Sequence, residues 1–258
     1  MNTRTLETAQ ADIVYDVEGP LPTADGRPPL FMIGQPMEAN GFYALASHFP
    51  DRTVVTYDPR GLGRSTRKDG RIDNDPAVQA RDLHNIIAAL GAGPVEMFAS
   101  SGGAITSLAL VTAYPNDVIT LVAHEPPLPA VLPDEKQAQR ALARFRDAYA
   151  SSGFGAGMAS FMATTMWHGE FNDEYFAQPL PNPAHFGLPT DDDGTRGDVL
   201  LSHRSDAVTD YRPNYDALKA APTRLVIALG EESAGTFPAR AAQVLADRLA
   251  CPGHPAHH

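Results

Sequence analysis

Apolar and polar residues alternate along the chain in blocks that predict strands followed by helices. Short and almost continuous apolar runs, typical of strands buried on both faces, occupy 29–33, 53–57, 95–99, 118–123 and 223–229, and an earlier strand is predicted over 11–17. Helical spacing of apolar residues follows at 42–49, 78–90 and 239–249. This rhythm predicts an α/β fold with a mostly parallel sheet flanked by helices.

The rhythm stops between 128 and 221, where no convincing strand pattern is found. Two helical patterns, at 137–149 and 155–167, precede a stretch rich in Pro, Asp, Asn and Gly. We therefore expect a core domain of 1–127 and 222–258 and a helical cap, or lid, of 128–221 inserted before the penultimate core strand. The cap would lie over the carboxyl ends of the strands, where ligands bind in open α/β sheets.

The stretch 95–104 (V-E-M-F-A-S-S-G-G-A) predicts a strand that ends at a serine and turns at once into a helix. Such an elbow exposes the hydroxyl of Ser101, and the small residues beside it allow neighbouring backbone to approach closely. Ala99 stands where the G-x-S-x-G pattern has its first glycine. The alternative interpretation is an ordinary glycine-rich turn between a strand and a helix.

Composition narrows the classes of partner and chemistry. The 258 residues carry a formal net charge of −11, which disfavours nucleic acid as a partner. Cys251 is the single cysteine, so no internal disulfide is possible. There is no signal-like segment, membrane span, zinc motif or P-loop motif, so we expect a cytoplasmic protein, a monomer or homodimer, with a small-molecule substrate and no cofactor or metal.

Three further motifs join the elbow in a resemblance to the α/β-hydrolase superfamily, which extends over about residues 12–249. They are I-G-Q-P at 33–36, Y-D-P-R-G-L-G-R-S at 57–65, and the strand end at Gly230. The resemblance implies a serine nucleophile, and the order serine, acid, histidine along the chain. The chain also resembles, more narrowly, the lactone hydrolases that open zearalenone, whose acid lies in an H-E-x-P segment like H-E-P-P at 124–127.

Two acids compete for the place that orients the base. Glu125 follows the strand after the elbow, and Glu232 (or Glu231) follows the strand after the cap. The commonest acid position in this superfamily is occupied here by Ser233, which cannot serve. The H-E-x-P resemblance favours Glu125, whereas the alternative is that Glu125 is a solvated loop residue.

The base is predicted to be His254, because P-G-H is how the histidine loop often reads in this superfamily. A last strand is expected between the helix at 239–249 and that loop, yet only three residues, 251–253, intervene. The alternative is that His254, His257 and His258 form a tail without chemistry. His124, beside the acid, is interpreted as structural.

The oxyanion of an acyl-transfer reaction needs two backbone N–H donors, and we expect those of Gln35 and Gly102, since Pro36 has none. Apolar residues of the cap and of the 33–37 loop are expected to line the substrate pocket, although helix packing alone would also explain them. They are Met37, Met158, Met162 and Trp167.

These residues predict a serine hydrolase that cleaves an ester or lactone of a moderately apolar small molecule through a Ser101–His254–Glu125 triad and an acyl-enzyme. Two other functions stay open. One is a non-catalytic protein that binds a ligand in the elbow cavity, and the other is a biosynthetic enzyme, a cyclase or C–C hydrolase, on the same fold.

Overall fold

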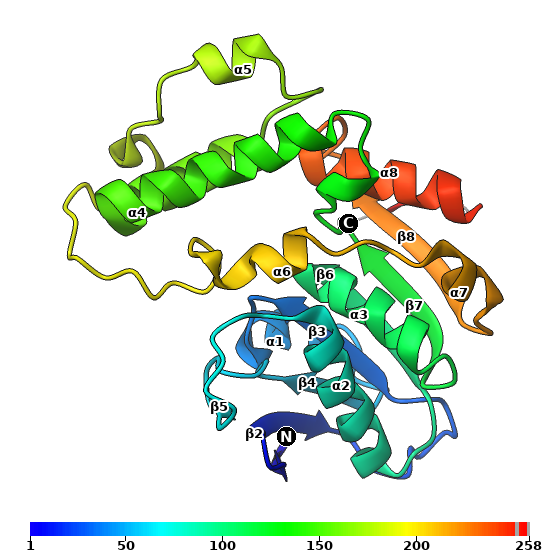
Figure 1. Cartoon of the computed structure of the whole chain (residues 1–258). Coiled ribbons are helices and arrows are strands. Elements are labelled where there is room, and N and C mark those ends of the chain that lie inside the picture. Colours follow the sequence, from blue (N-terminus) through cyan, green and yellow to red (C-terminus); the bar gives the residue numbers. More distant parts are fainter. Residues whose placement is uncertain (251–252, 257–258) are drawn as a thin grey trace.

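A computed structural model describes residues 1–250 and the backbone of 253–256, and its centre is one mixed sheet (Figure 1). Strand order in this sheet is β1-β2-β4-β3-β6-β7-β8-β9, with the short β5 paired to β2. Strands β3, β4, β6, β7, β8 and β9 run parallel, whereas β1, β2 and β5 are joined by antiparallel pairing. The predicted α/β class and parallel sheet are confirmed.

Strands β2, β3, β4, β6, β7 and β8 keep close to the apolar runs that predict them. The strands are β1 (Asn2–Glu7), β2 (Ala11–Glu18), β3 (Leu30–Gln35), β4 (Val54–Tyr57), β5 (Thr66–Arg67), β6 (Val95–Ser101), β7 (Val118–His124), β8 (Arg224–Gly230) and β9 (Gly253–Ala256). The edge strand β1 escaped sequence analysis because most of its residues are polar and none is buried, so it shows no apolar run.

The helices differ greatly in length. They are α1 (Tyr43–Ala46), α2 (Pro76–Leu90), α3 (Gly102–Ala113), α4 (Glu135–Thr165), α5 (Asp173–Ala177), α6 (Asp206–Thr209), α7 (Tyr215–Ala220) and α8 (Phe237–Leu249), with 3-10 turns at Ala39–Phe42, Pro129–Val131, Pro183–Phe186 and His203–Ser205. Helix α2 begins at Pro76 after the Asp75 cap and ends at Gly91, whose φ of 65° suits glycine. Among the described residues, no helix has the length and apolar content that crossing a membrane requires.

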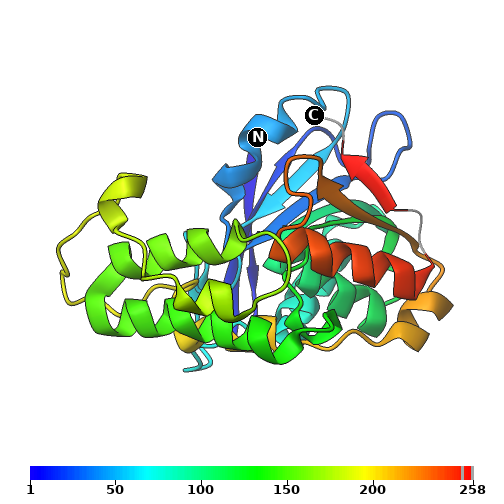
Figure 2. The same ribbon diagram turned by 90° about the horizontal axis from the view of Figure 1, so that it is seen from above.

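The pleat of β3 shows how the two faces of the sheet are covered. Phe31 and Ile33 belong to the main core, whereas Leu30 and Met32 pack with Phe42 of the 3-10 turn beside α1. Viewed from above, α1 lies on one side of the sheet and the pair α3 and α8 on the other (Figure 2). Helices thus cover the main-core side of the sheet, and on the other side the segment with α1 covers Leu30 and Met32 of β3 and Val54 of β4.

The segment between β7 and β8 is largely helical. Helices α4 and α5 lie over one end of the sheet, whereas α7 lies beside the start of β8 (Figure 1). The two predicted helical patterns form a single element, α4, which is interrupted at Gly153 (φ 80°, ψ −170°). The chain turns back there, so that Phe145 and Phe161 meet edge to face with ring centres 5.4 Å apart. A Cβ on Gly153 would lie 2.5 Å from Asp192 Oδ1, and only glycine fits this turn.

The loop after β4 is held by buried charges. Asp58 accepts hydrogen bonds from the backbone N–H of Ala39 (2.9 Å) and from Arg64 Nε (2.7 Å). The Arg60 guanidinium donates to both carboxylate oxygens of Asp82, at 2.8 and 2.6 Å. Burial raises the pKa of Asp58, but the hydrogen bonds from Arg64 and Ala39 outweigh it and leave the pKa below its ordinary value. These contacts give the D-P-R-G motif a structural role.

Candidate active site

Ser101 is the last residue of β6 and caps α3, so the elbow predicted from the sequence is present. Its backbone has φ 56° and ψ −127°, a region that residues with a side chain rarely adopt. Such strain costs about 1–3 kcal/mol and is found mainly at functional sites. The serine is exposed and borders a cavity, which leaves its hydroxyl available for chemistry.

The two glycines after Ser101 allow β3 to approach the start of α3. A Cβ on Gly102 would lie 2.6 Å from the carbonyl oxygen of Gln35, and one on Gly103 would lie 2.7 Å from the Cα of Gly34. Both obstacles are backbone atoms, which cannot rotate away as a side chain can. The end of β3 is therefore packed directly against the residue that follows the serine.

Glu125 lies at the end of β7, next to the elbow. Ser100 is paired with His124 across β6 and β7, so Ser101 and Glu125 each come one residue later, at the same edge of the sheet. Glu125 also has a positive φ, 48°. Its N–H donates to the carbonyl oxygen of Ala228 (3.0 Å), and its Oε1 accepts the N–H of Gly230 (2.9 Å). The carboxylate is thus fixed between two strand ends, with its side chain 17% exposed.

The competing acids are placed differently. Glu231 and Glu232 are both exposed, in the turn that follows Gly230. Ser233 donates its N–H to the carbonyl oxygen of Gly230, which closes that turn. Only Glu125 of these candidates is partly buried and anchored to a neighbouring strand by its side chain.

The expected last strand is present as β9, although the sequence leaves only three residues between the preceding helix and His254, because the strand itself includes His254. Backbone pairing with β8 defines this strand, whose four residues include a proline and carry no apolar pattern. His254 lies inside β9, opposite Ala228, and not in a loop after the strand.

The described backbone does not bring His254 to Ser101. Ala228 is paired with His124 and His124 with Ser100, so His254 is three strands away from β6. Three spacings of about 4.8 Å amount to about 14 Å. A histidine and a serine side chain joined by a hydrogen bond span about 10 Å at most. The side chain of His254, and all of His257 and His258, lie outside the described residues.

Gln35 and Gly102 come together as expected for two residues of one site. Gln35 ends β3 and is paired with Ser101, the last residue of β6. Gly102 follows Ser101 at the first position of α3, where backbone N–H groups have no partner within the helix. Both residues border the same cavity as Ser101. The backbone of both residues therefore lies beside Ser101 at this cavity.

The cavity beside Ser101 is small, about 70 Å³, and mostly apolar. The core contributes Gln35, Pro36, Ser101 and Gly102, and the cap closes it from above. The remaining lining residues are Asn74, Pro127, Leu142, Phe145, Phe161, Thr165, Leu200, Ser205, Val208, Thr209, Phe237 and Pro238. Among the described residues, no group of three or more His, Cys, Asp or Glu side chains is placed to hold a metal ion.

None of the four predicted pocket residues lines this cavity. Met37 is 39% exposed beside Gly34 and Gly41, and Met158 packs against the core. The Trp167 indole N–H donates to the carbonyl oxygen of Glu170 (3.1 Å). In the half of α4 after Gly153 the cavity is lined by Phe161 and Thr165, whereas Met162 is turned by about 100° from Phe161. Helical spacing identified the right helix but could not show which stripe faces the serine.

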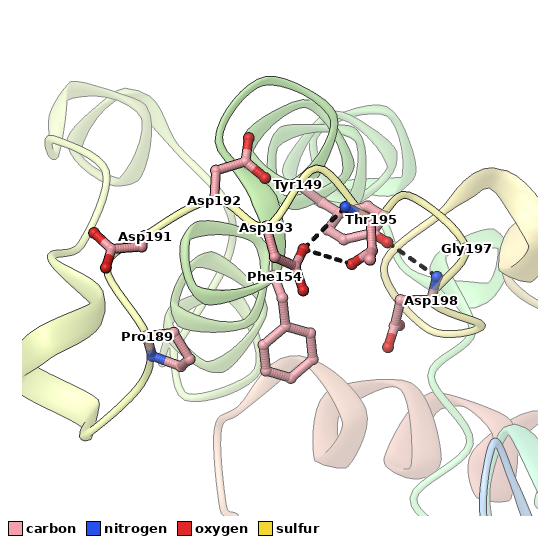
Figure 3. Close-up of a pocket in the computed structure, with 9 residues that line it drawn as sticks. All are labelled: Tyr149, Phe154, Pro189, Asp191, Asp192, Asp193, Thr195, Gly197 and Asp198. Atoms are coloured by element: carbon pink, nitrogen blue, oxygen red, sulfur yellow. Dashed lines mark hydrogen bonds between the residues drawn. The ribbon is translucent and has the colours of Figure 1, made fainter.

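A larger hollow, about 560 Å³, lies within the cap (Figure 3). It is formed by Tyr149 and Phe154 of α4 and by the loop 189–198. Asp193 accepts hydrogen bonds from the N–H and hydroxyl of Thr195, and the Tyr149 hydroxyl accepts the N–H of Asp198. Its polar groups thus hold the loop together, and its lining contains no residue of the elbow.

A second serine and a histidine, which sequence analysis left aside, lie one step from the elbow. Ser100 Oγ is 3.4 Å from His124 Nδ1, and His124 Nε2 is 4.0 Å from Glu125 Oε1. The first distance is that of a weak hydrogen bond, and the second is too long for one. Among the described histidines, His124 is the one beside the Glu125 carboxylate, its neighbour in sequence, and the pairing of β6 with β7 brings it to Ser100.

An elbow serine at the carboxyl edge of a parallel sheet, with small residues after it and an acid on the next strand, defines the α/β-hydrolase class. A family model described as the alpha/beta hydrolase fold matches residues 30–183, more than half of the chain. The chain belongs to this family.

Individual relatives are distant. The uncharacterized hydrolase YraK of Bacillus subtilis is 26% identical over 256 residues, which cover 96% of this chain and 86% of that protein. An α/β hydrolase from Sphaerobacter thermophilus superposes with a TM-score of 0.67 at 21% identity, covering 99% and 93% of the two chains. An N-acyl homoserine lactone degrading enzyme, Est816, gives a TM-score of 0.62 at 18% identity, covering 98% and 91%.

Proposed function

We propose that this member of the α/β-hydrolase family cleaves an ester or lactone bond with Ser101 as nucleophile. The observation that carries the proposal is the strained backbone of Ser101 (φ 56°), held by backbone contacts that only Gly102 and Gly103 permit. Strain of this kind persists where the surrounding structure enforces it, and here it exposes a hydroxyl at the mouth of a cavity.

The residues take the following roles. Ser101 Oγ attacks the carbonyl carbon while the base accepts its proton, and the N–H groups of Gly102 and Gln35 stabilise the oxyanion. The base then gives the proton to the leaving alcohol. Water attacks the acyl-enzyme in the same way and restores the serine. The mechanism needs no cofactor.

Glu125 is the proposed acid that orients the base. Its anchored, partly buried carboxylate next to the elbow supports this role over that of the exposed Glu232. The resemblance of H-E-P-P at 124–127 to the acid segment of zearalenone-opening lactonases also supports it. The base is proposed to be a histidine of the C-terminal segment. Because the described backbone of His254 lies too far from Ser101 for a hydrogen bond, His254 and His257 are to be replaced separately.

The size and lining of the cavity favour a substrate with a compact, moderately apolar acyl group. Its volume of about 70 Å³ and its lining by Phe145, Phe161 and Phe237 leave little room beside the serine. A similar fold in a protein that degrades N-acyl homoserine lactones is consistent with lactones as well as open-chain esters. We place small esters and lactones first among the substrates to be screened.

The test is labelling with a fluorophosphonate probe, located by peptide mass spectrometry. We expect one label per chain on Ser101, none in Ser101→Ala, and normal labelling in Ser100→Ala. His254→Gln, His257→Gln and His124→Gln then identify the base, because its loss should slow labelling by orders of magnitude. Folded protein that does not label would favour a ligand-binding role. Labelling without hydrolysis of any ester or lactone would favour a biosynthetic role.

A further inference from the structure

The side chain of Gln35 is buried, although the proposed oxyanion role uses only the backbone N–H of this residue. Only 4% of the residue is exposed, yet neither its side-chain nitrogen nor its side-chain oxygen has a hydrogen-bond partner. A buried polar group without a partner is destabilising, and such groups are rare in folded proteins. The backbone N–H of any residue but proline could serve the oxyanion, so the amide side chain calls for another explanation.

The hydroxyl groups of the cap that line the cavity already have hydrogen-bond partners. Ser205 and Thr209 both accept hydrogen bonds from the Arg146 guanidinium, at 3.3 and 3.0 Å, and donate to backbone carbonyl oxygens. Thr165 donates to the carbonyl oxygens of Phe161 and Met162. Among the described residues that line the cavity, Gln35 is the buried one whose two side-chain polar atoms both lack partners.

The position of Gln35 limits what its amide can reach. Gln35 is paired with Ser101 at the end of β3, and its Cβ lies 3.1 Å from where a Cβ on Gly102 would be. A carbonyl group held by Ser101 and the N–H of Gln35 would lie within one side-chain length of the carboxamide. Because Gln35 borders the cavity beside Ser101, its amide is nearer to the atoms next to the scissile carbonyl than to the far end of a substrate.

A carboxamide both donates and accepts hydrogen bonds, so its best partner is a group that does the same. We propose that the Gln35 side chain binds a polar substituent, such as a hydroxyl or an acylamino group, on the carbon next to the scissile carbonyl. The substrates are then esters or lactones of 2-hydroxy or 2-acylamino acids. This inference rests on the proposed function, because it takes Ser101 as the residue that holds the carbonyl.

Ethyl lactate and ethyl propionate differ only in the 2-hydroxyl, so they form the test pair. Each ester competes with the fluorophosphonate for Ser101, which reports affinity with or without turnover, and hydrolysis is followed in a pH-stat. We expect wild type to favour the lactate ester by about tenfold or more, since a site with an unpaired polar group rejects an analogue that leaves it unpaired. Gln35→Leu should abolish that preference, so that the ratio of kcat/KM for the two esters falls to about one.

Gln79 provides a matched control. It is 3% exposed, its amide atoms also lack partners, and it does not line the cavity. Gln79→Leu should keep the lactate preference. Both leucine variants remove an unpaired buried amide, so neither should have a lower melting temperature than wild type. A loss of ester preference in Gln35→Leu therefore could not be explained by unfolding.

Three results would overturn the inference. They are a wild type that does not prefer the lactate ester, a preference that survives Gln35→Leu, and an equal loss on both esters, which would assign the amide to the oxyanion. If Ser101→Ala labels or hydrolyses like wild type, the proposed function fails instead. The two failures are therefore distinguishable in one set of proteins.

Discussion

Replacing Gly103 with alanine tests whether close packing between β3 and α3 maintains the elbow. An ideal Cβ at this position lies 2.7 Å from the Cα of Gly34 and 3.0 Å from its N and C atoms, whereas ordinary contact begins at 3.4 Å. The two elements must separate by up to 0.7 Å, the difference between 3.4 and 2.7 Å. Overpacking of this kind costs about 1–3 kcal/mol.

The loss is measured by urea and thermal unfolding. For a chain of this size each kcal/mol lowers the melting temperature by about 2–4 °C, so we expect a decrease of about 2–12 °C for Gly103→Ala. The higher helix propensity of alanine offsets at most about 1 kcal/mol of this. Labelling of Ser101 should also slow, because Gln35 at the end of β3 would move away from the serine.

Gly197→Ala is the control, since a Cβ at that position meets no atom within 4 Å. Its stability should stay within about 0.5 kcal/mol of wild type. The packing argument is refuted if Gly103→Ala melts and labels like wild type, or if both alanine variants lose stability equally.

Further predictions concern the acid, the cavity and a buried ion pair. Glu125→Gln keeps an acceptor for Gly230 but loses the charge, so kcat for ester hydrolysis should fall about 10²–10⁴-fold, whereas Glu232→Gln should stay within about twofold. Phe161→Ala should shift kcat/KM toward longer acyl esters by about tenfold, with no shift for Met162→Ala, which does not line the cavity. The hydrogen bonds of Arg64 lower the pKa of Asp58 against the effect of burial, so their stabilisation is present above about pH 4 and lost as pH falls through the folded-state pKa. Urea midpoints measured from pH 5 to pH 3 should therefore fall less steeply in Arg64→Met than in wild type, and an equally steep fall would contradict this.

The sequence predicts the central strands well because β3 and β4 are buried throughout, and β6, β7 and β8 bury about every second residue, so that each strand is a nearly continuous apolar run. Strands β3, β4, β6, β7 and β8 follow such runs to within a residue or two. The strands β1 and β9 are defined by hydrogen bonds to a neighbour, which leave no apolar signature. The elbow is predictable for a steric reason, since the small residues after Ser101 are needed where β3 backbone comes within contact distance.

The cavity is harder to predict because its lining comes from parts of the chain far apart in sequence. Helical periodicity shows that α4 has an apolar face, but the reversal at Gly153 decides which stripe meets the serine. Phe161 and Thr165 line the cavity, and the methionines that seemed natural pocket residues pack elsewhere or face outward. The position of His254 depends likewise on strand pairing, which the local sequence does not specify.

Three locally unfavourable features, two strained backbone conformations and one unpaired buried amide, lie together at the carboxyl edge of β3, β6 and β7. Ser101 and Glu125 have positive φ values, 56° and 48°, although neither is glycine, and Gln35 buries an amide without partners. Each departure destabilises the free protein, and neighbouring strand ends hold all three in place. A sequence tends to break local rules where function requires it, so their meeting at one cavity argues for a reaction site more strongly than any one of them does. The same reasoning explains why Gln35→Leu should be harmless to stability and yet change which ester the protein prefers.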